Sequence, residues 1–68
     1  MPKIKLYHEG SDSKGTIYNV RQDRCGVVYN FEDQGPDGKT IIYKDCTSKS
    51  LAHVLAILKW GCWTILAD

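Results

Sequence analysis

The sequence has only two prolines, one methionine and one phenylalanine, and it lacks a strong excess of charge of either sign. Nine Lys and Arg residues stand against eight Asp and Glu residues, which gives a formal net charge of +1. A strongly basic nucleic-acid-binding domain or an acidic mimic of DNA would lie far from this balance. Hydrophobic residues still make up 43% of the 68 residues, which excludes wholesale disorder and a collagen-like chain. We therefore expect one small globular domain over residues 1–68, with a single modest core.

Cysteine is also scarce and has no motif spacing. The three cysteines are an odd number, so they cannot all pair within one chain, and none forms a C-x-x-C motif. Together with His53, the thiols of Cys25, Cys46 and Cys62 have the right ligand types for zinc, but their spacing matches no zinc module. We expect reduced cysteines packed as small hydrophobic residues, with no metal and no cofactor.

Long apolar runs are missing as well. The N-terminal stretch lacks the apolar run of a signal peptide. The most apolar stretch, residues 51–67, is interrupted by His53, Lys59 and Gly61 and is shorter than the ~20 apolar residues of a membrane span. We therefore expect a cytoplasmic protein that does not insert into a membrane.

Four short segments have the composition of β-strands. They are rich in β-branched and aromatic residues and cover residues 3–8, 16–21, 27–32 and 40–44. Segments rich in Gly, Asp and Ser separate them, and Pro36-Asp37-Gly38 is a strong turn signal between the third and the fourth. Such short connections predict an antiparallel meander.

The hydrophobic period changes after residue 48. Apolar residues at Leu51, Val54, Leu55 and Leu58 have helical spacing. Thr47 or Ser48 is the expected N-cap, and Gly61 is expected to end the helix in the left-handed conformation. A short strand over residues 62–66 is favoured over a continued helix, because a glycine inside a helix costs about 1 kcal/mol. The predicted fold class is α+β, with a meander of about four strands, one helix on one face of the sheet and a short C-terminal strand.

Strand alternation assigns residues to the two sheet faces. The side bearing Tyr18, Val27, Tyr29, Phe31 and Tyr43 is the more apolar and is predicted to face the helix. In the first strand, Ile4 and Leu6 are the predicted core side, which leaves Lys3, Lys5 and Tyr7 outside. Trp63 is expected in the core, whereas Trp60 either covers the end of the core or is an exposed anchor.

No catalytic constellation can be placed, because neither histidine has a recognisable Ser, Cys or Asp partner. The leading hypothesis is a non-enzymatic module that binds another protein through the open sheet face or a sheet edge. The candidate protein-binding residues are Tyr7, Ile17, Asn19, Arg21, Val28, Asn30, Ile42, Lys44 and Trp60. In size and general architecture only, such a chain is similar to small inhibitors from viruses or mobile elements, including anti-CRISPR proteins.

Two other functions stay open. A single-stranded RNA or DNA could stack on the sheet, with Lys3, Lys5, Tyr7, Arg21 and Lys44 as the binding residues. The domain could also form a homodimer by pairing sheet faces or edges.

Overall fold

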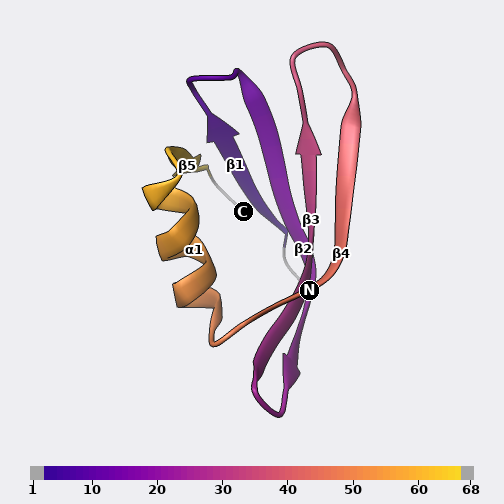
Figure 1. The fold of residues 1–68 in the computed structure, drawn as a ribbon, viewed down its shortest axis with the longest axis vertical. Helices are drawn as coiled ribbons and strands as arrows, with labels where there is room; N and C mark the ends of the chain where they lie inside the picture. Colours follow the sequence, from indigo (N-terminus) through magenta and orange to yellow (C-terminus); the bar gives the residue numbers. More distant parts are fainter. Residues whose placement is uncertain (1–2, 67–68) are drawn as a thin grey trace.

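The computed structural model describes residues 3–66, which form one antiparallel sheet and one helix. The elements in chain order are β1 (Ile4–His8), β2 (Ser13–Asp23), β3 (Gly26–Gln34), β4 (Thr40–Ser48), α1 (Leu51–Trp60) and β5 (Trp63–Ile65). The five strands lie in the order β4-β3-β2-β1-β5, so the meander is complete and β5 pairs antiparallel with β1 (Figure 1). The predicted α+β class, the meander and the strand after the helix are confirmed.

β2 begins earlier than the composition indicates, because Gly15 belongs to the strand and not to the preceding turn. A Cβ on Gly15 would lie 2.9 Å from ring atoms of both Phe31 and Trp63. The two aromatic rings occupy the space that a side chain would need, which explains why this position is glycine.

Two β-bulges change the alternation of side chains. β2 carries one extra residue between Tyr18 and Arg21, and β4 carries one between Tyr43 and Cys46, opposite Asn30 on β3. Asn19 and Asp45 have positive φ at these positions (54° and 55°), a conformation that Asn and Asp tolerate better than most residues. The β2 bulge brings Ile17 onto the same face as Val20, although the two are three residues apart. The prediction that Tyr18 faces the helix and Ile17 faces away is therefore wrong.

The helix begins two residues later than the predicted caps allow. Thr47 and Ser48 are still part of β4, and the N-cap is Ser50, whose hydroxyl accepts a hydrogen bond of 3.1 Å from the backbone N–H of His53. Gly61 follows the last helical residue as predicted, but its φ is −81°, and Cys62 takes the positive φ of 69° instead.

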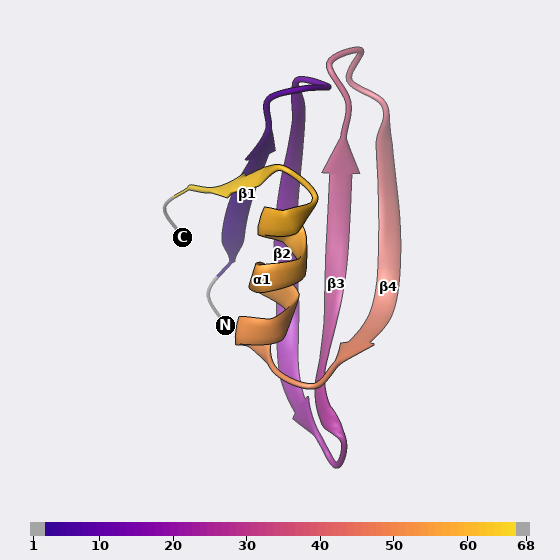
Figure 2. The same cartoon turned by 60° about the vertical axis from the view of Figure 1, so that its left-hand side comes forward.

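The core lies between α1 and the sheet, on one face only. Its buried members are Leu6, Ile17, Val20, Val27 and Val54. Trp63, which was expected in the core, is half-buried and packs against this cluster without being one of its buried members. Figure 2 shows α1 in front of β1 and β2, while β3 and β4 lie beside it and are not covered. β3 and β4 stay uncovered because a helix about 10 Å wide covers only about two strands that are ~4.8 Å apart.

Candidate protein-docking surface

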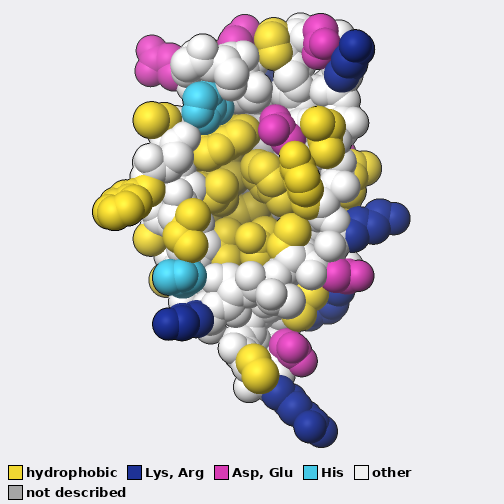
Figure 3. All heavy atoms as spheres, in the orientation of Figure 1, with side chains coloured by type: hydrophobic (Ala, Val, Ile, Leu, Met, Phe, Trp, Pro, Cys, Tyr) yellow, Lys and Arg dark blue, Asp and Glu magenta, His cyan; other side chains and the backbone are white. Residues whose placement is uncertain are grey.

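The uncovered half of the helix-side face is an apolar hollow. It has a volume of about 300 Å³ and is lined by Tyr29, Phe31, Asp33, Tyr43, Cys46, Leu58 and Trp63. We call these seven residues the apolar hollow. In Figure 3 hydrophobic side chains gather in the centre of the face between α1 and β4, and charged side chains stand at its margins. An exposed apolar surface therefore lies on the same face as the helix, in addition to the opposite face on which the sequence placed the candidate binding residues.

Strand alternation and the β4 bulge together build the hollow. Alternate residues of β3, from Tyr29 through Phe31 to Asp33, point to the helix side. The extra residue in β4 keeps both Tyr43 and Cys46 on that side, although they are three positions apart. Strand alternation predicted the correct face for Tyr29, Phe31 and Tyr43, but we expected these residues to be buried in the core.

The aromatic rings of the hollow hold one another in place. Phe31 and Tyr43 are stacked, with ring centroids 6.2 Å apart and an angle of 25° between the planes. Trp63 meets Phe31 edge-on with ring centroids 5.5 Å apart, and it makes a second edge contact with the His8 ring at 5.2 Å. Burial raises the pKa of the Tyr29 hydroxyl, and the neighbouring Cys46 adds to the shift, so this tyrosine stays neutral at physiological pH.

β4 is a free edge of the sheet (Figure 1), and its residues Tyr43 and Cys46 line the hollow. Its first half exposes Ile41, Ile42 and Tyr43. The backbone N–H of Gly35 donates to the carbonyl of Lys39 at 2.9 Å, which makes these two a hydrogen-bonded pair of the hairpin. Because such pairs alternate in an antiparallel ladder, Thr40 and Ile42 direct their backbone N–H and C=O groups away from β3. This edge can accept another strand.

Two of the predicted protein-binding residues are not accessible. Ile17 is 0% exposed and forms part of the core, because the β2 bulge moves it to the helix side. Asn30 is 9% exposed, and its Oδ1 accepts a hydrogen bond of 3.0 Å from the backbone N–H of Asp45. Asn30 therefore stabilises the β4 bulge, and both residues are removed from the candidate surface.

Of the other predicted residues on the outer face, several have partners within the chain. Arg21 forms an ion pair with Asp45 and donates to the Asn19 carbonyl at 3.0 Å. The Tyr7 hydroxyl donates to the Asp12 carboxylate at 2.7 Å, and this hydrogen bond is the main cause of its raised pKa. Val28 is half-buried, and Asn19 is exposed at the β2 bulge.

Ile42 and Lys44 are exposed on the edge strand β4. Trp60 is 94% exposed and is therefore not part of the core. It forms a second, shallower apolar patch on the outer side of α1 with His53, Ala56 and Ile57.

The residues of the nucleic-acid hypothesis do not come together. Lys3, Lys5 and Tyr7 belong to the β1 end of the sheet, whereas Lys44 is on β4, three strands away. At ~4.8 Å per strand this separation is about 14 Å across the sheet. Arg21 lies between them and is already paired with Asp45. The basic groups are thus scattered and do not form a stripe.

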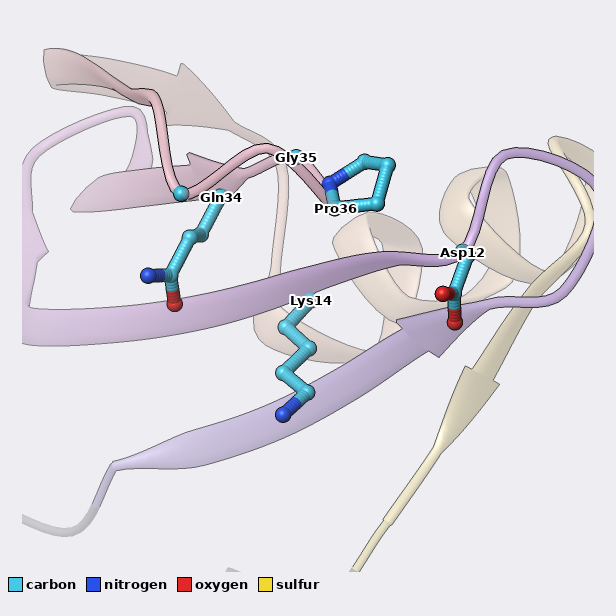
Figure 4. A pocket seen from close by; sticks show the side chains of 6 residues that line it. Asp12, Lys14, Gln34, Gly35 and Pro36 are labelled. Atoms are coloured by element: carbon cyan, nitrogen blue, oxygen red, sulfur yellow. The ribbon is translucent and has the colours of Figure 1, made fainter.

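A polar pocket of about 220 Å³ lies where the β1–β2 and β3–β4 turns approach each other. Figure 4 shows Asp12, Lys14 and Gln34 with their side chains on the same side of the ribbon, and Gly35 and Pro36 above them. One carboxylate and one ammonium group offset each other here, so the pocket has no net charge to select an ion.

Other chemistry is sparse in residues 3–66. No group of three or more His, Cys, Asp or Glu side chains lies close enough to hold a metal ion within this range, and all three cysteines are free. The Nδ1 atom of His8 lies 2.9 Å from the Ser11 hydroxyl, and both residues are near a surface turn. The helix of this range, α1, is not long and apolar enough to cross a membrane.

Comparison with protein-family models, with curated proteins and with solved structures gave no significant match.

Proposed function

We propose that this chain is a small protein-binding module that docks the apolar hollow and the adjoining free edge of β4 on a partner protein. The observation that carries the proposal is the hollow itself, in which aromatic and aliphatic side chains stand open beside a helix too narrow to cover them. Aromatic anchors at the centre of a surface with polar margins are typical of protein interfaces. An inhibitor of other proteins would be one form of this function, and its target would be the partner.

Truncation of Tyr43 tests the face that docks. We expect Tyr43→Ala to weaken partner binding about thirtyfold or more, because it removes a central aromatic anchor. Tyr18→Ala is the matched control: it is the same substitution on the opposite face of the sheet, where we expect little change. The measurement is the affinity, by titration calorimetry, for proteins captured from source-cell lysate by the wild-type chain. Equal losses for the two variants, or a loss for Tyr18→Ala alone, would contradict docking through the hollow.

Proline on β4 tests the edge. Ile42→Pro removes a backbone N–H that points away from β3, so the sheet keeps its own hydrogen bonds and folding should be retained. We expect this variant to bind the partner about tenfold more weakly or worse, because the ring replaces a donor and obstructs an added strand. Ile42→Thr keeps the donor and a β-branched side chain, and it should bind nearly as well as the wild type. If the two variants bind alike, the partner does not add a strand to β4.

Single-stranded nucleic acid is the alternative ligand, and variants of Tyr7 and Tyr43 distinguish it from a protein partner. Fluorescence polarisation with a random single-stranded RNA and DNA pool at low salt would detect it. Binding that weakens steeply with salt, and is lost on Tyr7→Ala but kept on Tyr43→Ala, would replace the protein-binding proposal.

A further inference from the structure

We infer that the partner inserts a basic side chain, Lys or Arg, into the apolar hollow, with its aliphatic stem on the rings of Phe31 and Tyr43 and its charge against Asp33. This inference rests on the proposed function and names the chemistry of the bound segment. The starting point is Asp33, the one charged residue among those that line the hollow.

The Asp33 carboxylate has no partner of its own in the described part of the chain. Residues 3–66 contain no hydrogen bond and no ion pair to this side chain. Asp33 is half-buried in β3. The nearest basic residue along the ladder is Lys14, but it precedes Gly15, the residue opposite Asp33, so strand alternation directs Lys14 to the other face. Lys39 is two residues from Ile41, the residue opposite Asp33, so alternation places it on the same face, but it is exposed and forms no ion pair with Asp33. The carboxylate is therefore open to a cation from a partner.

The charge decides between possible anchors. A purely apolar side chain that filled the hollow would take water away from the Asp33 carboxylate without replacing it, and burying an unpaired charge is costly. An acidic side chain would add repulsion. A Lys or Arg side chain avoids both costs, because its stem is apolar and its end is a hydrogen-bond donor of opposite charge.

The rings add a second attraction for a cation. Phe31 and Tyr43 are stacked, and Tyr29 and Trp63 complete the aromatic lining. The face of an aromatic ring attracts a cation within about 6 Å of the ring centroid. The volume of about 300 Å³ is at the lower limit of ordinary ligand pockets, so the hollow suits one long side chain and not a folded element.

Selection of displayed peptides tests this chemistry without a known partner. The probe is a library of random linear peptides displayed on phage, selected separately on the wild-type chain, on Asp33→Asn and on Tyr43→Ala. We expect the peptides that need Tyr43 to share a Lys or Arg next to apolar residues. Synthetic copies of them should bind Asp33→Asn about tenfold more weakly or worse, as loss of a charged hydrogen bond implies. Replacing their basic residue by norleucine should cause a similar loss.

Two further variants sharpen the test. Glu32→Gln is the matched control, because it neutralises the neighbouring carboxylate on the opposite face and should leave peptide binding unchanged. Asp33→Lys should shift the selected peptides from basic to acidic residues. Peptides that need Tyr43 but lack a basic residue, and bind Asp33→Asn as well as the wild type, would overturn the inference and leave the proposed function standing. Failure to select any peptide that depends on Tyr43 would overturn both.

Discussion

Truncation of Ile17 to alanine should lower the free energy of unfolding by about 2–5 kcal/mol, because it empties a fully enclosed position of the core. Ile17 is 0% exposed, whereas Ile42 on the edge strand is 47% exposed. Ile42→Ala deletes the same atoms from the surface and should change the free energy of unfolding by less than about 0.5 kcal/mol. Urea unfolding followed by circular dichroism measures both values. For a domain of this size the first loss is a large part of the total stability.

The same pair of variants tests the β2 bulge. Simple alternation along the strands places Ile17 and Ile42 on one exposed face, and on that arrangement the two truncations would cost about the same. The bulge at Asn19 separates them, because it moves Ile17 into the core with Leu6 and Val54. Equal unfolding energies for the two variants would mean that β2 runs without the bulge.

The fold class could be predicted from local patterns. Alternating β-branched and aromatic residues indicated each meander strand, and the spacing of Leu51, Val54 and Leu58 indicated the helix. The turn around Pro36 and Gly38 indicated the β3–β4 hairpin. These signals arise from neighbours in the sequence, so a reading of the sequence recovers them.

The two bulges could not be predicted in the same way. A bulge is set by pairing with the neighbouring strand, and one inserted residue exchanges the faces of everything beyond it. A signal was present, since Asn19 interrupts a run of β-branched and aromatic residues from Thr16 to Val20, and Asn tolerates the left-handed conformation. The same reasoning applies to Asp45 in β4. Without the register of β3, however, neither residue shows whether it forms a bulge or simply faces solvent.

The apolar hollow was not predicted because the size of the helix was not compared with the width of the sheet. The sequence assigned Phe31 and Tyr43 to the helix side correctly, and we expected the helix to cover that side completely. A ten-residue helix is only ~15 Å long and about two strands wide, so a sheet of five strands leaves part of one face open. The comparison of helix size with strand number is available from the sequence and would have indicated that part of this face stays open.

The second large effect concerns Gly26, the first residue of β3, which lies at the end of the sheet from which the chain leaves for the helix. Its φ is +147°, and a Cβ there would lie 2.0 Å from the backbone carbonyl oxygen of Ser48 and 2.8 Å from that of Lys49. We expect Gly26→Ala to lower the free energy of unfolding by about 3 kcal/mol or more, from backbone strain together with this overlap.

Gly38→Ala separates the two contributions. Gly38 also has a positive φ, +85°, but a Cβ there would meet no atom within 4 Å. Its substitution should therefore cost only the conformational strain, about 1 kcal/mol. Urea unfolding of both variants gives the difference, which measures how tightly Gly26 packs under the Ser48–Lys49 backbone. Since this backbone leads into α1, a Gly26→Ala chain that stays folded should also displace the helix and alter the hollow. This change should be visible in the tryptophan fluorescence, to which Trp60 and Trp63 both contribute. A Gly26→Ala variant no less stable than Gly38→Ala would show that the β4–α1 connection does not depend on this contact.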